Sequence, residues 1–422
     1  VLAGAGIAFA RVDVRGTGDS EGVLTDEYSE AELIDGEACI AWLATRNWCN
    51  GSVGMRGISW GGINTLMIAA RRPPALKAIV PMAAADNRFT DDAHYIGGRI
   101  GKPNLDWGVL FKTVLAGPPD PEVVGDAWEE MWQTRLESTP AVVTEWLRHQ
   151  SFDAYWQRGS VCLDPSAISC PVYLVAGWQD TYVNFVGSLL ASLAVPVRAL
   201  IGPWGHTYPG FARPQSIDWA NEEVSFWRRW LLGETEAVDE APRLLAYLPE
   251  QTARQCHPEP IPGAWRRLDR LPDTRRCFRL EPGVLVAEDS PTAGSVDDSA
   301  VIRWTQMAPV GFATAEWLDR LPEEQSRDDE ASLCFDTAPL TESVTMLGRA
   351  SLTLGVSENA ASMLTARLCD VDEDGHSWLV SYASLEPGSS AELEFRLAGH
   401  VFMPGHRLRI SISGGLWPMT WP

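Results

Sequence analysis

A pentapeptide at residues 57–61, Gly-Ile-Ser-Trp-Gly, constrains the fold of this chain more than any other feature. Residues 54–58 read as a short apolar strand, and residues 62–70 read as a buried helix that ends before a Pro-Pro pair. A strand that turns directly into a helix leaves no room for side chains beside the turn residue, so small residues must flank it. Because such a turn exposes the serine hydroxyl, the sequence predicts Ser59 as a nucleophile.

Two further β-rich runs end near polar residues that could assist a serine nucleophile. Residues 171–177 precede Asp180, and residues 197–203 precede His206. A serine hydroxyl needs an imidazole to take its proton, and the imidazole needs a carboxylate to fix its tautomer and stabilise its cation. The chain order serine, aspartate, histidine is also the order that accompanies a strand-to-helix nucleophile turn. The sequence therefore predicts a triad of Ser59, Asp180 and His206.

Each member of the predicted triad also has a structural alternative. A serine after a strand is commonly a helix N-cap, an aspartate there is usually a turn residue, and a loop histidine usually lies at the surface. Three independent local contexts in the expected order favour the triad. The backbone amide of Trp60, which follows the nucleophile, is the predicted donor to the oxyanion that forms during attack.

These motifs and two earlier ones resemble the CocE/NonD family, the cocaine esterase and X-Pro dipeptidyl-peptidase-like hydrolases. The earlier motifs are Asp-Val-Arg-Gly-Thr-Gly-Asp-Ser-Glu-Gly at 13–22 and Trp-Cys-Asn-Gly-Ser-Val-Gly-Met at 48–55, and the later ones are Gly-Trp-Gln-Asp at 177–180 and Gly-Pro-Trp-Gly-His at 202–206. The resemblance runs nearly end to end and matches the family's nucleophile, acid and base to Ser59, Asp180 and His206. It also implies that a tyrosine hydroxyl before the first motif is the second oxyanion donor, and no residue here matches it.

Strand and helix patterns predict an α/β-hydrolase catalytic domain in two pieces, residues 1–85 and 167–237. Within the first piece, residues 7–14 are expected to form a strand and residues 29–46 a helix. Residues 86–166 lack β-rich runs and carry many aromatic side chains at helical spacing. This segment is the predicted helical cap, inserted into the catalytic domain.

Residues 238–422 carry short β-rich segments separated by Gly, Pro, Asp and Ser. Segments such as 244–248, 301–305 and 408–413 are typical of a β-sandwich, and the family's C-terminal jelly-roll domain is similar. The chain starts with Val1 and stops soon after an apolar strand, so we expect it to be truncated at both ends and the jelly roll to be incomplete.

Four residues are predicted to contact the substrate: Asp91, Asp92, Trp178 and Tyr182. The acidic pair follows the strand that comes after the helix of residues 62–70, at the entrance to the cap. It resembles the Asp-Asp region of α-amino acid ester hydrolases in this family. There, carboxylates help to hold a substrate ammonium. The hypothesis is that one of the pair favours substrates with a free amine, and the alternative is a structural or solvated acidic pair.

The function predicted from these residues is that of a serine hydrolase that cleaves a small ester or amide through an acyl-enzyme on Ser59, with His206 as general base and Asp180 as orienting acid. Esters are favoured because alkoxide leaving groups need less protonation than amines. Two enzyme alternatives stay open, an X-Pro dipeptidyl aminopeptidase and an α-amino acid ester hydrolase. An alternative from another class is a noncatalytic binding protein that retains the fold.

The composition excludes some classes of partner and some cellular locations for this chain. A formal net charge of −22 disfavours nucleic acid, and no apolar stretch is long enough to span a bilayer. The eight cysteines lack a two-residue spacing, which favours buried thiols in a reducing compartment over zinc or redox sites. We therefore expect no cofactor or metal, no membrane or nucleic-acid partner, a small ester or short peptide substrate, and a cytoplasmic location. A homo-oligomer stays open.

Overall fold

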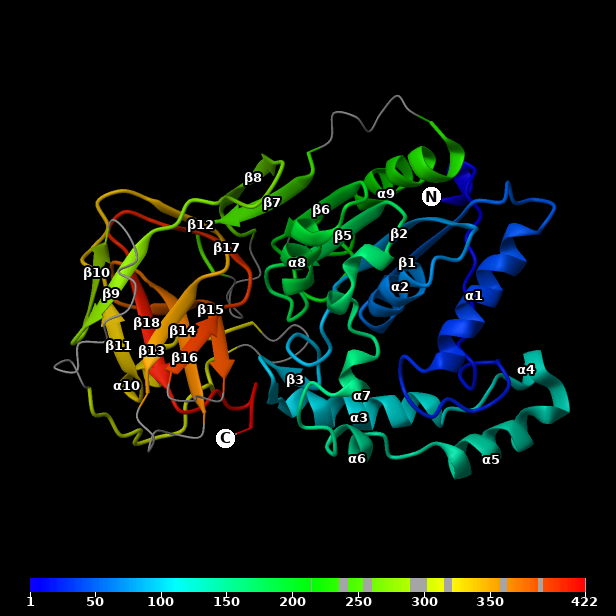
Figure 1. Cartoon of the computed structure of the whole chain (residues 1–422), viewed down its shortest axis with the longest axis horizontal. Helices are drawn as coiled ribbons and strands as arrows, with labels where there is room; N and C mark the ends of the chain where they lie inside the picture. Colours follow the sequence, from blue (N-terminus) through cyan, green and yellow to red (C-terminus); the bar gives the residue numbers. More distant parts are fainter. Residues whose placement is uncertain are drawn as a thin grey trace.

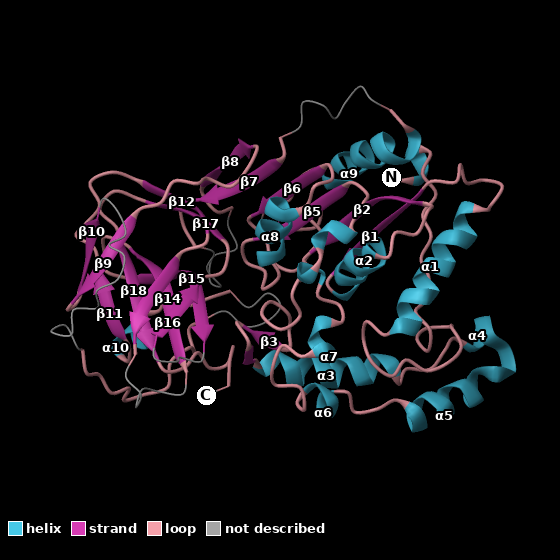
Figure 2. Cartoon of the chain, in the orientation of Figure 1, coloured by secondary structure: helices cyan, strands magenta, loops and turns pink. Residues whose placement is uncertain are grey.

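The computed structural model describes residues 1–213, 215–234, 242–252, 260–288, 302–314, 321–356, 363–385 and 390–421. Two bodies lie side by side, an α/β body from the N-terminal part of the chain, up to β8, and a strand-rich body from the C-terminal part (Figure 1). Helices surround the sheet of the first body, whereas strands dominate the second (Figure 2).

The α/β body is built on a six-stranded sheet with the order β1-β2-β5-β6-β7-β8. Its strands are β1 (Val53–Ile58), β2 (Leu76–Met82), β5 (Val172–Gly177), β6 (Val197–Gly202), β7 (Leu244–Pro249) and β8 (Gly263–Leu268). The first five are parallel and β8 pairs antiparallel with β7. Parallel strands are covered on both faces, which explains why β5 and β7 read as near-continuous apolar runs.

Helices cover both faces of this sheet, and the sheet separates the apolar core into two layers. The helices of this body are α1 (Glu30–Ala44), α2 (Trp60–Ala70), α8 (Asn184–Ser192) and α9 (Trp219–Trp227). Side chains alternate across a strand, so Ile79 of β2 packs with α1, α2 and α8, whereas its neighbours Ala78 and Val80 pack with α9. The Ser29 hydroxyl accepts the N–H of Glu32 and fixes the start of α1, which matches the predicted helix.

The segment between β2 and β5 consists of helices joined by loops, with two short strands, β3 (Tyr95–Ile96) and β4 (Arg99–Ile100). Its α-helices are α3 (Lys102–Leu115), α4 (Pro121–Val124), α5 (Trp128–Ser138), α6 (Val143–Trp146) and α7 (Ala154–Gln157). Phe111, Trp146 and Trp156 are fully buried and form the centre of its own small core. The aromatic residues of the predicted cap therefore serve largely to pack it.

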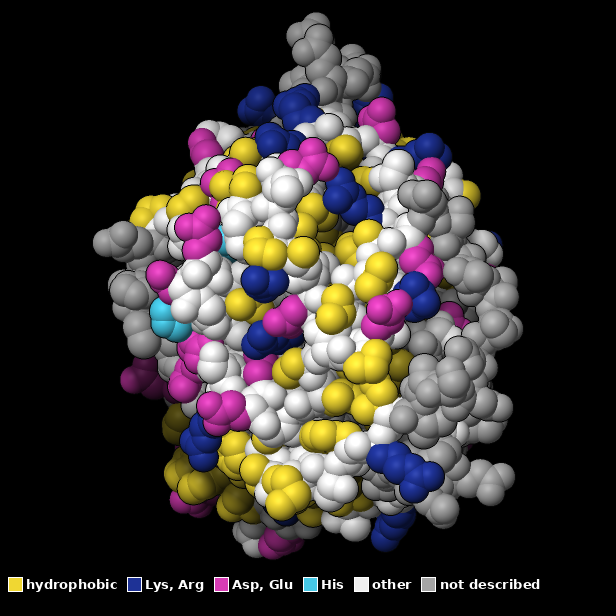
Figure 3. Space-filling model, turned by 90° about the vertical axis from the view of Figure 1, so that its left-hand side faces the viewer, with side chains coloured by type: hydrophobic (Ala, Val, Ile, Leu, Met, Phe, Trp, Pro, Cys, Tyr) yellow, Lys and Arg dark blue, Asp and Glu magenta, His cyan; other side chains and the backbone are white. Residues whose placement is uncertain are grey.

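The strand-rich body holds a second six-stranded sheet, β15-β14-β18-β11-β10-β9, and two strand pairs, β12-β17 and β13-β16. The bounds of its strands are β9 (Cys277–Glu281), β10 (Val284–Glu288), β11 (Leu333–Asp336), β12 (Val344–Gly348), β13 (Ser351–Gly355), β14 (Leu364–Val371), β15 (Ser377–Leu385), β16 (Ser390–Glu394), β17 (Ala398–Phe402) and β18 (Arg407–Ser413), with one short helix, α10 (Ser326–Glu330). Phe335, Phe395 and Phe402 lie in the core between these sheets. On the face of this body shown in Figure 3, acidic, basic and apolar side chains are interspersed.

Three predictions about strands are wrong. Residues 244–248 do form a strand, but as β7 they extend the α/β sheet beside β6 instead of belonging to the sandwich. Residues 7–14 form no strand, and their Phe9 and Val12 side chains are 63% and 57% exposed, because no strand of the described sheet runs beside them. Of the strand expected at 301–305, residue 301 lies outside the described residues and residues 302–305 form no strand. An apolar run specifies an extended conformation, but a ladder also requires a partner strand.

Within the described ranges, no helix combines the length and the hydropathy that crossing a membrane would require.

Candidate active site

Ser59 forms the junction between β1 and α2 with an unusual backbone conformation, φ 59° and ψ −125°. Its N–H lies 3.0 Å from the carbonyl oxygen of Met82 and 3.1 Å from that of Ala83, so the end of β2 holds the turn in place. Ser59 occupies the N-cap position of α2, but its side chain makes no capping hydrogen bond to the helix, so the hydroxyl is not used as a cap. A non-glycine residue held in this region is strained, as expected where a hydroxyl is presented for chemistry.

The turn around Ser59 (the elbow) requires glycine at some positions, but at only one of the two glycines of the pentapeptide. A Cβ on Gly57 would lie 2.2 Å from the backbone of Gly61, and a Cβ on Gly62 would lie 2.5 Å from the carbonyl oxygen of Met82. A Cβ on Gly61 would meet nothing within 4 Å. The steric requirement predicted for residue 61 therefore belongs to Gly62, one residue later.

Asp180 and His206 lie in the loops after β5 and β6, and the structure brings them into contact. The Nδ1 of His206 is 3.0 Å from Oδ2 of Asp180, and the other carboxylate oxygen accepts the N–H of Tyr182 at 2.9 Å. Asp180 is 3% exposed, so its carboxylate makes these contacts away from bulk water. A buried carboxylate on Nδ1 directs the proton of neutral imidazole to that nitrogen and leaves Nε2 to act as a base.

The parallel register places the ends of β1, β2, β5 and β6 at one edge of the sheet. Ile58 is paired with Met82, and Gly177 with Gly202. The residues that follow these strands, Ser59, Asp180 and His206, therefore share the carboxyl edge, where open α/β sheets bind their ligands.

Trp60 is the first residue of α2, so its backbone N–H has no acceptor within the helix. This amide is therefore free to face an oxyanion, as predicted from its position after the nucleophile. The indole of Trp60 packs against Trp107 and Phe111 of α3, with ring centroids 6.2 and 5.1 Å away. The cap thus contacts the residue that follows Ser59.

The structure places Asp91 and Asp92 near Tyr182 but gives them different partners. The Tyr182 hydroxyl donates to Asp92 at 2.9 Å, and the Asn184 amide donates to Asp91. Asp92 is 3% exposed, whereas Asp91 is partly exposed. Tyr182 also donates its N–H to Asp180, so it connects Asp92 to the Asp180 loop.

Comparisons with known proteins agree with this architecture. The sequence model of the X-Pro dipeptidyl-peptidase (S15 family) matches residues 1–208, and that of the X-Pro dipeptidyl-peptidase C-terminal non-catalytic domain matches residues 236–422. Cocaine esterase from Rhodococcus sp. (strain MB1 Bresler) is 27% identical over 98% of this chain and 81% of its own length. The chain belongs to the CocE/NonD family of serine hydrolases.

Solved structures of the CocE/NonD family share its fold. The CocE/NonD family hydrolase from Staphylococcus aureus superposes with a TM-score of 0.70 at 16% identity, over 95% of this chain and 71% of that one. An α-amino acid ester hydrolase gives a TM-score of 0.66 at 22% identity, over 97% and 78% of the two chains. The predicted fold class, an α/β-hydrolase followed by a strand-rich domain, is thereby confirmed, as is the prediction of a serine hydrolase.

This CocE/NonD hydrolase also contains a buried charged cluster that the sequence reasoning missed. The Arg88 guanidinium pairs with Glu27, and Nε2 of His94 lies 2.6 Å from the same carboxylate. Burial alone would raise the pKa of Glu27, but the charges of His94 and Arg88 and hydrogen bonds from His94 and Trp107 lower that pKa to about 2. The cluster joins the loop before α1 to the cap, and no local sequence signal marks it because Glu27 lies 61 residues from Arg88 and 67 from His94.

Glu27, Asp92 and His94 offer ligand atoms that lie close enough to hold a metal ion. Arg88, however, already supplies positive charge to both carboxylates, directly at Glu27 and with its Nε 3.8 Å from Asp92. Burial raises the pKa of Asp92, which His94 and Arg88 oppose. The donor set is therefore neutralised by protein side chains and is a poor fit to a metal.

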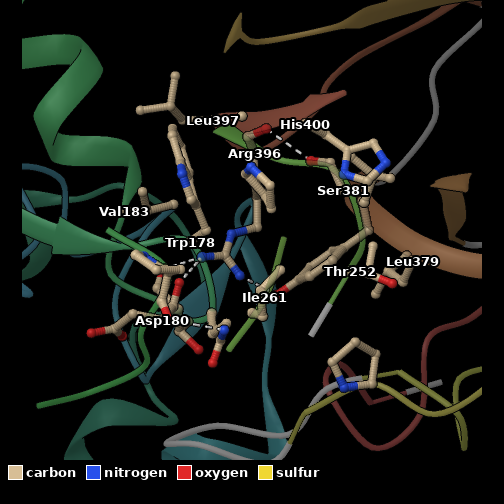
Figure 4. Close-up of a pocket in the computed structure, with 18 of the residues that line it drawn as sticks. Trp178, Asp180, Val183, Thr252, Ile261, Leu379, Ser381, Arg396, Leu397 and His400 are labelled. Carbon is tan, nitrogen blue, oxygen red and sulfur yellow. Dashed lines mark hydrogen bonds between the residues drawn. The ribbon is translucent and has the colours of Figure 1, made fainter. Parts of the chain in front are cut away.

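Trp178, the remaining predicted substrate residue, lies between the two bodies. Its indole donates to the carbonyl oxygen of Tyr247 at 2.5 Å and packs closely against Gly399 of β17. It lines a cavity of about 110 Å³ together with Asp180, Arg396 and His400 (Figure 4). The contacts of Trp178 that the structure shows are those of an interdomain residue.

Proposed function

We propose that this hydrolase cleaves small esters through an acyl-enzyme on Ser59, with His206 as general base and Asp180 as its orienting acid. The observation that carries the proposal is the strained Ser59 backbone, which presents a hydroxyl free of capping at the same sheet edge as the His206–Asp180 pair. Membership of a serine hydrolase family supports it and disfavours a noncatalytic binding protein.

The chemistry follows from this arrangement. His206 removes the proton of Ser59 as the oxygen attacks the ester carbonyl, and the Trp60 amide donates to the resulting oxyanion. His206 then returns that proton to the departing alkoxide, which leaves as an alcohol while the acyl group stays on Ser59. A water molecule, deprotonated by the same imidazole, attacks the acyl-enzyme; the bond from the acyl carbon to Ser59 Oγ breaks, His206 returns the proton to that oxygen, and the carboxylic acid is released.

Labelling with a fluorophosphonate tests the nucleophile. We expect covalent labelling at Ser59, with turnover of p-nitrophenyl esters lowered by about four to six orders of magnitude in Ser59→Ala. Substrate binding should survive this substitution. A folded protein that stays unlabelled at Ser59 and turns over none of these esters would contradict the proposal.

Ester and peptide chemistry can be separated with one pair of substrates. A putative Xaa-Pro dipeptidyl-peptidase from Streptomyces avermitilis is 25% identical over 87% of this chain and 52% of its own length, so X-Pro peptides are the second substrate class to test. We expect p-nitrophenyl esters to be cleaved faster than an X-Pro p-nitroanilide, because p-nitrophenolate can leave without being protonated whereas the anilide nitrogen must receive a proton. Preferential cleavage of the anilide would favour the peptidase.

Asp91 is the better candidate for recognising a substrate amine. Asp92 is buried and its charge is balanced by Arg88, whereas Asp91 is partly exposed and its structural partners are the neutral Asn184 and Thr90. An amine-binding Asp91 predicts that amino-acid esters are cleaved more efficiently than their N-acetylated forms. It also predicts that Asp91→Asn removes this preference, whereas equal efficiency in the parent enzyme would contradict the hypothesis.

A cytoplasmic location and a small ester or short peptide partner are also proposed. The seven cysteines that the structure describes are all free thiols, which suits a reducing compartment. Fractionation of the native host tests this location, and recovery in the secreted fraction would contradict it.

A further inference from the structure

One arginine of the strand-rich body reaches the loop that carries the catalytic acid. The Nη2 of Arg396 donates to the carbonyl oxygens of Asp180 at 2.7 Å and Thr181 at 2.5 Å. Arg396 follows β16 and lies more than two hundred residues later in the chain. Figure 4 shows its guanidinium directed at the Asp180 loop.

The strand-rich body fixes this arginine on its other side. The Nη1 of Arg396 donates to the Tyr382 hydroxyl at 2.8 Å, and its backbone carbonyl accepts the hydroxyl of Ser381 at 2.8 Å. The next residue, Leu397, is 3% exposed and packs into the core of the α/β body. Its N–H donates to the Asn184 side chain at 2.8 Å. Contacts within the strand-rich body therefore fix the position of the guanidinium that donates to the loop of Asp180.

The contacts of Arg396 hold the backbone carbonyl group of Asp180, whereas the contacts of its carboxylate hold the side chain. One carboxylate oxygen accepts from His206 and the other from the Tyr182 N–H, so the side chain is aimed correctly only if the backbone of this loop stays in place. The two carbonyl oxygens face the boundary between the bodies, and a planar guanidinium can satisfy both at once. Without it, two carbonyl groups at this boundary would lose their donor.

We propose that Arg396 is a positioning residue of the hydrolase, through which the strand-rich body holds Asp180 in register with His206. This inference rests on the proposed function, since it assigns Asp180 the role of catalytic acid. It gives the C-terminal body a part in turnover through a single side chain that touches no reacting atom.

The test is the Arg396→Met variant, assayed with a p-nitrophenyl ester and normalised by fluorophosphonate titration of active sites. We expect kcat to fall about 10- to 100-fold with KM nearly unchanged, because small displacements of a catalytic group cost about this much. The conservative Arg396→Lys variant should recover a substantial part of kcat, since an ammonium can still donate to these carbonyls. A kcat equal to that of the wild type in Arg396→Met would overturn the proposal.

Arg349→Met is the matched control for a general loss of interdomain contact. Arg349 also crosses the boundary and donates to a backbone carbonyl, that of Asn184 at 3.2 Å, and it pairs with Glu394. It makes no contact with the carbonyl groups of residues 180 and 181. We expect this variant to lower thermal stability while leaving kcat close to that of the wild type, and an equal loss of kcat in both variants would overturn a specific role for Arg396.

If Arg396→Met does not fold, Tyr382→Phe decides the question. This variant keeps the ring and removes only the hydroxyl that orients the guanidinium, so kcat should fall several-fold at constant KM. An unchanged kcat in a folded Tyr382→Phe protein would overturn the proposal. Failure of the underlying function would look different, because the wild-type enzyme itself would then show neither labelling at Ser59 nor turnover.

Discussion

The Asp180 carboxylate contacts His206 through Oδ2, at 3.0 Å from Nδ1, while Oδ1 accepts the N–H of Tyr182. One oxygen therefore sets the imidazole tautomer and the other keeps the carboxylate in place. This division of tasks separates the acid's chemical role from its structural one.

Asp180→Asn is expected to preserve the fold and lower kcat about 10⁴-fold. The amide oxygen can still accept from Tyr182, but the amide cannot stabilise a cationic imidazole and favours the wrong tautomer. Steady-state kinetics on a p-nitrophenyl ester, with circular dichroism as the check of folding, measures this. A loss below tenfold would show that His206 acts without this carboxylate.

The elbow glycines should differ sharply in their tolerance of alanine. Gly57→Ala and Gly62→Ala each place a methyl group 2.2–2.5 Å from backbone atoms, which can be relieved only by moving the turn that carries Ser59. We expect both to lose most activity or to fail to fold. Gly61→Ala meets nothing within 4 Å and should retain activity. Comparing soluble yield and turnover of the three variants checks this, and an inactive Gly61→Ala would refute the steric explanation.

The local parts of the fold could be predicted from the sequence because each depends on neighbouring residues. The strand, turn and helix around Ser59 lie within twenty residues, and Ser29 caps α1 three residues before the amide it accepts. The α/β-hydrolase class followed from the alternation of strands and helices. These signals depend on periodicity and short-range sterics, which a single sequence displays directly.

Contacts between distant segments could not be predicted in the same way. Residues 244–248 show the apolar pattern of a strand in either body, and only pairing with β6 decides between them. Arg88 and Glu27 are 61 residues apart and Arg396 and Asp180 are 216 apart, so no spacing rule connects them. A charged residue destined for burial looks like a surface residue until its partner is known.

Arg88→Met should be strongly destabilising because it removes the guanidinium that balances the buried carboxylates of Glu27 and Asp92 and leaves only His94 beside them. Removing one partner of a buried pair typically costs about 3–5 kcal/mol, and Arg88 is fully buried here. Urea unfolding at neutral pH measures the loss. Arg15→Met is the control, because the Arg15–Asp35 pair is exposed and should contribute little. Equal stability of the two variants would show that the cluster does not support the fold.

Glu32 should give the unfolding free energy a distinct pH dependence. It lies buried in α1, with one oxygen 2.5 Å from the Asn64 amide nitrogen. Burial raises its pKa from 4.5 to about 7, against the hydrogen bond from Asn64. Between these values the native state binds more protons at this site than the unfolded chain. This group therefore makes stability fall as pH rises from about 4.5 to about 7, and the loss is complete above that window.

Glu32→Gln removes this titration and keeps an oxygen that can accept from Asn64. The difference in unfolding free energy between the variant and the wild type should be about 1–3 kcal/mol more favourable to the variant at pH 8 than at pH 4.5. Urea unfolding of both proteins at both pH values measures this difference. Burial and the charge of Asp91 also raise the pKa of Asp86 to about 7. The wild type and the variant both contain Asp86, so its titration cancels when their unfolding free energies are subtracted. Glu30→Gln is the control on the same helix, since the Glu30 side chain is 65% exposed and its substitution should change stability little at either pH. A pH-independent difference between Glu32→Gln and the wild type would mean that Glu32 is ionised in the folded protein across this range.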